Sequence, residues 1–215
     1  MTQPINVKIC GVTDPAHLPV IAKAGARYVG FVLYPRSPRA VTLEALASLL
    51  AQTPPNLETV ALCVDPDDEL IQRLTRLSRL NMLQLHGHET PQRVAAIRSL
   101  WQRPIMKALS LTQAEDLAAA SAYAPLVEQF LFDAKPPEGG LPGGNALAFD
   151  WQILAGRTFP KPWLLAGGLT AANVAQAIAI SGAKQVDVSS GVEDAPGKKS
   201  AGKIMTFCEA ARGAG

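Results

Sequence analysis

The sequence predicts an α/β protein with a single-domain (β/α)8-barrel fold, and two observations lead to this prediction. First, eight apolar runs of strand length alternate with longer segments of helical period, which is typical of a parallel sheet built from βα units. Second, 215 residues suffice for one large core but are few for two, so residues 1–215 are expected to form one domain. Eight units in this length favour a closed barrel over an open doubly wound sheet, the alternative fold.

Each predicted strand is followed by a loop and a helical pattern. The eight strands are Asn6–Cys10, Tyr28–Leu33, Thr59–Val64, Met82–Leu85, Ile105–Ala108, Gln129–Phe132, Trp163–Ala166 and Gln185–Val188. Start and stop signals support this division, because Asp14 with Pro15 suits a helix N-terminus, and Gly25 and Gly182 suit helix C-termini. Four further helices are expected to begin at threonine caps, namely Thr42, Thr90, Thr112 and Thr170.

Composition and charge exclude several classes of protein. The net charge of +2 comes from 20 basic and 18 acidic residues without a basic stripe, so nucleic acid is not an expected partner. No stretch reaches the roughly 20 apolar residues of a membrane span, and the N-terminus does not read as a signal peptide. The three cysteines form neither an even disulfide set nor a CxxC pair. Together these features predict free thiols and a cytoplasmic location.

Cys10 and Asp133 are the candidates for proton transfer. Cys10 ends the first predicted strand, so its thiol is expected at the mouth of the barrel, where nearby cations or helix N-termini would make it a usable base. Its alternative role is that of a small buried hydrophobic residue, the role we assign to Cys63 and Cys208. Asp133 follows the sixth strand, where partial burial would let it hold a proton for donation; its alternative is a helix cap or an ion pair with Lys135.

Two glycine-rich turns follow the last two predicted strands, Gly167-Gly168 and Ser189-Ser190-Gly191. Glycine lets the backbone approach an oxyanion closely, and N–H groups at a helix N-terminus bind phosphate. One such turn is common in any protein. Two of them after strands seven and eight, where barrels of this kind frequently bind phosphate, predict a phosphorylated substrate.

Three further residues are expected at the mouth of the barrel. Arg36 and Arg39 follow the second strand and are either surface charges or ligands of a substrate carboxylate. His86 follows the fourth strand and suits a structural hydrogen bond as well as a substrate contact. The spacing of cysteines and histidines matches no metal site, so no metal is expected. The long Gly- and Pro-rich segment Ala134–Phe149 is either an active-site loop or a flexible linker.

The sequence resembles the phosphoribosylanthranilate isomerase family of tryptophan biosynthesis over nearly the whole chain. The matching segments, in order, are KICG at Lys8–Gly11, GFVLYPRSPRAV at Gly30–Val41, LQLHG at Leu83–Gly87, LFDAK at Leu131–Lys135, FDW at Phe149–Trp151, LAGGLTAANV at Leu165–Val174 and VDVSSGVEDAPGKKS at Val186–Ser200. The combination of KICG, SPR and DVSSGVE is specific among phosphate-binding barrels.

The resemblance implies an Amadori rearrangement of N-(5-phosphoribosyl)anthranilate without a cofactor. In the family's mechanism, the residue matching Asp133 protonates the furanose ring oxygen, and the cysteine matching Cys10 then removes the proton from C2′. Arg39 resembles the residue that contacts the anthranilate carboxylate. The segments matching the family's phosphate site contain Gly167, Gly168, Ser189, Ser190 and Gly191, with Asp187 beside them to orient the site. The resemblance leaves open whether the enzyme is a monomer or a homodimer.

The chain departs from the family's pattern at two places. The sixth loop reads Gly143-Gly144-Asn145-Ala146, with lengthened spacing, where the family often has GG[ST]G, which affects how that loop closes. Ser200 replaces an aspartate of the final motif and can still cap the last helix.

Three alternative functions are considered. A different barrel enzyme for phosphorylated sugars would not need both Cys10 and Asp133, and an inactive binding protein would lack the pair. An isomerase of relaxed specificity would also accept the aminoimidazole carboxamide ribotide of histidine biosynthesis. Arg39 suits a carboxylated aromatic and favours the narrow substrate.

Overall fold

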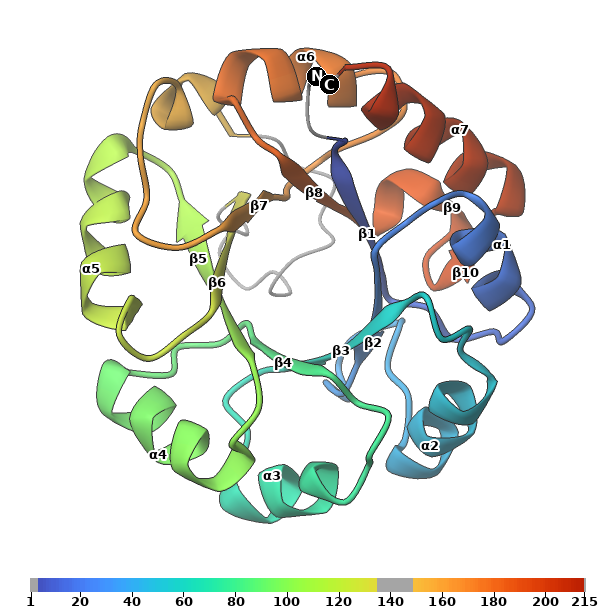
Figure 1. Ribbon diagram of the computed structural model, residues 1–215, viewed down its shortest axis with the longest axis vertical. Coiled ribbons are helices and arrows are strands. Elements are labelled where there is room, and N and C mark those ends of the chain that lie inside the picture. The colour runs from blue at the N-terminus through green and yellow to red at the C-terminus, as the bar shows by residue number, and fades with distance from the viewer. Residues whose placement is uncertain (1–3, 135–148, 215) are drawn as a thin grey trace.

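The computed structural model describes residues 4–134 and 149–214, and within them the chain forms a closed barrel of eight parallel strands in sequence order (Figure 1). The strands are β1 (Asn6–Cys10), β2 (Tyr28–Val32), β3 (Glu58–Cys63), β4 (Met82–Leu85), β5 (Ile105–Leu111), β6 (Gln129–Ala134), β7 (Trp163–Leu165) and β8 (Gln185–Val188). β1 pairs with β8, so the sheet has no open edge. The predicted barrel and all eight strands are confirmed, and the open sheet is excluded.

Helices surround the barrel on its outside (Figure 1). They are α1 (His17–Lys23), α2 (Leu43–Gln52), α3 (Asp68–Thr75), α4 (Pro91–Trp101), α5 (Ala120–Tyr123), α6 (Val174–Ser181) and α7 (Ala201–Arg212), with 3₁₀ helices η1 (Ala114–Ala119), η2 (Trp151–Leu154) and η3 (Ser190–Val192). The prediction of an α-helix after the sixth strand is wrong for the described residues. Between β6 and β7 these residues form the 3₁₀ helix η2 instead.

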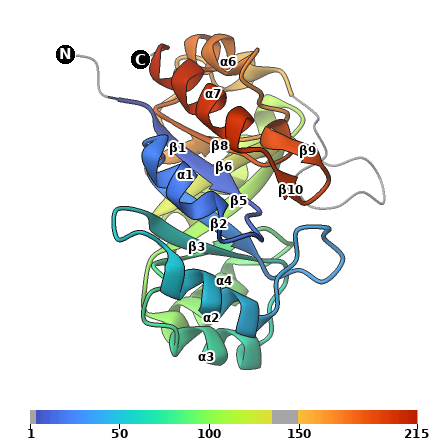
Figure 2. The ribbon, with the colours of Figure 1, turned by 90° about the vertical axis from the view of Figure 1, so that its right-hand side faces the viewer.

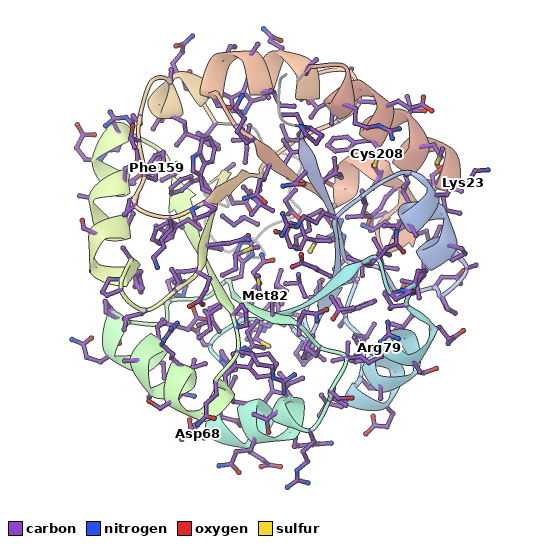
Figure 3. All side chains as sticks on the ribbon, in the orientation of Figure 1. Lys23, Asp68, Arg79, Met82, Phe159 and Cys208 are labelled. Carbon is purple, nitrogen blue, oxygen red and sulfur yellow. The ribbon has the colours of Figure 1, made fainter. Side chains whose placement is uncertain are left out.

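The alternation of side chains along the strands separates two apolar layers. Side chains from six strands form one inner cluster: Tyr28, Val60, Met82, Met106, Ala108, Leu131, Leu164 and Ala166. Met82 accordingly lies inside the ring of strands in Figure 3, whereas Cys208 lies between α7 and the strands. A larger cluster of apolar side chains fills that outer layer between strands and helices. Residues two positions beyond an inner-cluster residue on the same strand therefore face the interior of the barrel.

The cap predictions are confirmed in part. The hydroxyls of Thr42 and Thr90 accept bonds from the first turns of α2 and α4, and Gly182 ends α6 in the left-handed conformation. The expected Thr112 and Thr170 caps are wrong, because Gln113 precedes η1 and Asn173 precedes α6.

Three other helix-end predictions have mixed outcomes. The Asp14 carboxylate accepts the Ala16 N–H in a turn before α1, which begins only at His17 with Ala16 as its N-cap, so the expected helix start is wrong by two residues. Gly25 follows the end of that helix with a positive φ, as predicted. Ser200 occupies the N-cap position of α7, but its hydroxyl makes no capping bond to the helix.

A short antiparallel hairpin extends the loop between β8 and α7. It consists of β9 (Glu193–Ala195) and β10 (Lys198–Lys199). In Figure 2 the hairpin lies at the same end of the barrel as the loop after β2. Among the described residues, every helix is too short or too polar to cross a lipid bilayer.

The Thr90 cap gives a stability prediction. The Thr90 hydroxyl accepts a 3.2 Å bond from the Arg93 N–H, and an N-cap hydroxyl of this kind stabilises a protein by about 1 kcal/mol. Thr90→Ala is therefore expected to lower the free energy of unfolding by about 1 kcal/mol in a denaturant titration. The control is Thr112→Ala, another exposed threonine before a helical segment that does not cap it. Equal effects of the two substitutions would contradict the assignment.

Candidate functional site

The predicted site residues all lie at the C-terminal ends of barrel strands. They are Cys10 in β1, Arg39 after β2, His86 after β4, Asp133 in β6, Gly167 and Gly168 after β7, Asp187 in β8, and Ser189, Ser190 and Gly191 after β8. Because the C-terminal ends of parallel barrel strands open on one mouth, the structure gathers these residues at one end of the barrel. The exposed Arg36 has no partner that would connect it to them among the described residues.

Cys10 lies in an apolar part of the barrel mouth with two buried lysines near it. The side chain packs with Val32 and Leu62 and is 4% exposed. Burial raises the pKa of the Cys10 thiol above its ordinary value, whereas the ammonium groups of Lys8 and Lys199 lower it. Cations lie near Cys10, as the sequence analysis expects, but the effect of burial on the thiol pKa outweighs theirs.

Lys8 forms a buried ion pair with Asp187. The Lys8 Nζ is 2.7 Å from the Asp187 Oδ1, and the lysine side chain is 0% exposed. The two residues are register partners on the adjacent strands β1 and β8. Burial alone would lower the pKa of Lys8, but the carboxylate of Asp187 and the Cys10 thiol raise it above its ordinary value. The ion pair thus favours the charged, ammonium form of Lys8.

Asp133 contacts His86 across the mouth of the barrel. The Asp133 Oδ2 lies 3.3 Å from the His86 Nε2, and both side chains are buried. They come from β6 and the end of β4, which are separated by β5, so the contact is made inside the barrel. The Asp133 Oδ1 accepts the Ala134 N–H at 2.8 Å. The carboxyl group is thus held toward the interior, and the alternative partner Lys135 lies outside the described residues.

A buried glutamine orients the His86 ring. The Gln84 Nε2 lies 2.9 Å from the His86 Nδ1, and an amide N–H that donates to Nδ1 leaves the ring hydrogen on Nε2, facing Asp133. Gln84 is completely buried and lies two residues before His86 on the same face of β4. His86 therefore turns its Nε2 toward the carboxyl group of Asp133.

The turns after β7 and β8 lie against each other. Gly167 and Gly168 both have positive φ angles, 89° and 62°, which glycine adopts without strain. The Gly168 carbonyl accepts a bond from the Asn173 Nδ2 at 3.0 Å, which shapes the turn before α6. A side chain at Gly191 would collide with the Leu169 carbonyl, so the two turns are in direct contact. The two turns therefore form one continuous surface at the C-terminal end of the barrel.

Lys199 fixes the turn after β8. Its Nζ donates to the Ser189 carbonyl at 3.0 Å and lies 3.3 Å from the Ser189 hydroxyl. The same ammonium group is 2.7 Å from the Glu193 Oε1, with both side chains buried. Burial lowers the pKa of Lys199 below its ordinary value, although the Glu193 carboxylate opposes this shift. This hairpin lysine places a positive charge beside the surface formed by the two turns.

Arg39 is held by Glu193 rather than exposed to solvent. Its Nε and Nη2 each donate to one Glu193 oxygen at 2.8 Å, in a bidentate pair. Burial alone would raise the pKa of Glu193, but the bonds from Arg39 and Lys199 bring it below its ordinary value. The Arg39 side chain also lies where a side chain at Gly11 would be, directly after Cys10. The Arg39 Nη1 makes no hydrogen bond to the described residues.

The remaining sequence predictions have separate outcomes. Cys63 and Cys208 are buried within packing layers, as expected, and burial raises their pKa values to about 12 and about 11. The altered positions Asn145 and Ala146 lie outside the described residues. Over the described residues, no group of three or more His, Cys, Asp or Glu is placed to hold a metal ion.

Four residues of the site were missed by the sequence analysis, namely Lys8, Gln84, Glu193 and Lys199. Two of them had a detectable signal, because Lys8 and Gln84 are polar residues in predicted barrel strands, two positions before Cys10 and His86 and hence on the same inner face. The partners of Glu193 and Lys199 depend on how the hairpin folds back, which no local pattern indicates.

Comparison with known proteins identifies relatives of the whole chain. The family model described as N-(5'phosphoribosyl)anthranilate (PRA) isomerase matches residues 7–210. A protein of Paramagnetospirillum magneticum named N-(5'-phosphoribosyl)anthranilate isomerase is 54% identical over 211 residues, which cover 98% of this chain and 98% of the relative.

Two solved structures show the same fold at full length. The phosphoribosyl anthranilate isomerase of Thermotoga maritima matches with a TM-score of 0.87 and 33% identity, covering 97% of this chain and 99% of that one. A phosphoribosyl anthranilate isomerase in complex with reduced 1-(o-carboxyphenylamino)-1-deoxyribulose 5-phosphate matches with a TM-score of 0.82 and 31% identity, with the same coverage of both chains.

Gly30 provides a test of the site geometry. A Cβ at this position would lie 3.0 Å from the Cys10 Sγ and 3.2 Å from the Lys8 Nζ, closer than ordinary packing allows. Since a displacement of about 1 Å in a reacting group can lower a rate about 10²-fold, Gly30→Ala is expected to reduce turnover of N-(5'-phosphoribosyl)anthranilate by about that factor. The control is Gly202→Ala in α7, where a Cβ has no neighbour within 4 Å among the described residues. Similar rates for the two variants would contradict the geometry.

Proposed function

Because this chain belongs to the N-(5'-phosphoribosyl)anthranilate isomerase family, we propose that it converts N-(5-phosphoribosyl)anthranilate to 1-(2-carboxyphenylamino)-1-deoxy-D-ribulose 5-phosphate. This Amadori rearrangement is a step of tryptophan biosynthesis. The observation that supports the roles proposed below is the placement of a thiol and a hydrogen-bonded carboxyl group at one barrel mouth, beside two joined glycine turns. General acid–base chemistry by these side chains needs no cofactor.

Asp133 acts first, as the general acid. It donates a proton to the furanose ring oxygen, the ring C1′–O bond breaks, and the product is an open-chain Schiff base between the sugar and the anthranilate nitrogen. The Asp133 carboxylate that remains accepts a hydrogen bond from the His86 Nε2–H, which lies 3.3 Å away. His86 therefore holds the acid in position and stabilises the charge that the acid acquires.

Cys10 acts second, as the general base. Its thiolate removes the proton from C2′, and the electron pair of that C–H bond forms the C1′–C2′ double bond while the Schiff-base nitrogen becomes neutral. The resulting enolamine tautomerises to the ketone product. The apolar surroundings of the Cys10 thiol exclude water from this step, since Val32 and Leu62 pack against it.

Two anchors hold the ends of the substrate. The 5′-phosphate binds the backbone N–H groups of the turns after β7 and β8, with Lys199 supplying a positive charge beside them. The anthranilate carboxylate binds the free Nη1 side of the Arg39 guanidinium, whose opposite edge is held by Glu193. Asp187 does not touch the phosphate in this arrangement, because its carboxylate is paired with Lys8.

The partner that this site requires is a small phosphorylated substrate. We place the reaction in the cytoplasm. The enzyme acts as a monomer or homodimer. The Arg39–Glu193 arrangement favours a carboxylated aromatic substrate over the carboxamide of the histidine pathway.

Substitution of the acid and of the base tests these roles separately. Cys10→Ser and Asp133→Asn are each expected to lower kcat by about 10²–10⁴-fold, because each removes one positioned proton transfer. Cys208→Ser changes another buried cysteine away from the mouth and is the control, expected to retain turnover. Turnover is followed by the loss of substrate fluorescence. Near-normal kcat in either site variant would exclude the role assigned to that residue.

The pH dependence of kcat/KM tests the ionisation of Cys10. Only the thiolate accepts the C2′ proton, so activity is lost as pH falls below the thiol pKa. Since burial raises the pKa of the Cys10 thiol, kcat/KM is expected to keep rising above neutral pH, by about tenfold per pH unit on the acid side of that pKa. A kcat/KM that stays constant from neutral to alkaline pH would be inconsistent with a buried thiol base.

A further inference from the structure

Lys8 is a charged residue in a place where few lysines are found. Its side chain is completely buried in β1, inside a barrel whose adjacent interior cluster is apolar. A buried ammonium group is unfavourable unless it is paired and hydrogen-bonded. Asp187 provides one such partner at 2.7 Å, through one carboxylate oxygen. An ammonium group has three hydrogens to donate, so the Asp187 bond uses only part of what Lys8 offers.

The second neighbour of the Lys8 ammonium is the thiol of Cys10. The two residues are two positions apart on β1, so their side chains leave the strand on the same face. The ends of both side chains lie beside Gly30 of the adjacent strand, where a Cβ would lie 3.0 Å from the Cys10 Sγ and 3.2 Å from the Lys8 Nζ. Gly30, which pairs with Cys10 in the β1–β2 register, thus leaves the space in which these two groups approach each other.

We propose that Lys8 is a positioning residue that stabilises the thiolate of Cys10, with its ammonium group shared between Asp187 on one side and the sulfur on the other. This inference rests on the proposed role of Cys10 as the base. During the reaction the proton moves from C2′ to the sulfur, and Lys8 keeps all three of its own hydrogens throughout.

The other charges that face Cys10 do not replace Lys8. Asp187 on β8 is negative and disfavours the thiolate, and Lys199 on β10 is paired with Glu193, which also holds Arg39. Of these groups, Lys8 has the largest effect on the pKa of the thiol and lowers it, whereas Asp187 raises it to a smaller extent. Of the charged groups near Cys10, the Lys8 ammonium therefore does most to offset the rise in the thiol pKa that burial causes.

The test is the ionisation of Cys10 in the absence of substrate. The thiolate is titrated by its ultraviolet absorbance, and each protein is compared with its own Cys10→Ser version so that tyrosines and other thiols cancel. In Lys8→Met the midpoint of the Cys10 titration is expected to rise by about 1–3 pH units, the size expected when a close opposite charge is lost. An unchanged midpoint in folded Lys8→Met protein would overturn the proposal.

A matched control separates this effect from the general loss of a buried ion pair. Lys107 is also a buried lysine, on β5, and it pairs with the buried Glu89 at 2.8 Å. Lys107→Met removes an equivalent buried charge on another strand, so it should destabilise the fold without moving the Cys10 midpoint. Equal shifts in Lys8→Met and Lys107→Met would overturn the proposal, since the effect would then be structural.

A double variant keeps the test decisive if Lys8→Met does not fold. Lys8→Met with Asp187→Asn leaves no unpaired charge, and its midpoint is still expected to rise, by less than in the single variant, because Lys8 affects the thiol more than Asp187 does. A midpoint equal to or below that of the wild type would overturn the proposal. The titration needs no turnover, so a failure of the proposed isomerase function would be seen separately, as an inactive wild type.

Discussion

The buried ion pair between Lys8 and Asp187 joins the first and last strands at the seam where the barrel closes. Removing one partner of such a pair typically costs about 3–5 kcal/mol, because the other charge stays buried alone. Barrel closure in turn decides the composition of the site. It brings Cys10 at the end of β1 beside the turn that follows β8, although 179 residues separate them along the chain.

A second set of charges organises the adjacent part of the same mouth. Glu193 binds Arg39 through both oxygens and Lys199 through one, so a single carboxylate connects the loop after β2 to the hairpin after β8. The guanidinium is thereby fixed before any substrate arrives. Fixed charges of this kind need no reorganisation when substrate charge develops, which is the physical advantage of a preorganised site.

Local sequence patterns were sufficient to predict the strands and to select the two proton-transfer candidates. Strand length, apolar runs and a polar residue at a strand end are all properties of residues close together in the sequence. Partners distant in sequence could not be predicted in this way. Arg39 was expected to be a substrate ligand, and its bond to Glu193, 154 residues away, depends on the closed barrel and on the hairpin. The Thr112 and Thr170 caps failed because Gln113 and Asn173, the residues directly preceding the helical segments, take the N-cap positions.

The most direct test of the isomerase assignment is the reaction itself, measured on freshly generated N-(5-phosphoribosyl)anthranilate with the wild-type enzyme. The account predicts that the substrate fluorescence decays much faster with the wild-type enzyme than in enzyme-free buffer. Decay no faster than in buffer would contradict the assignment.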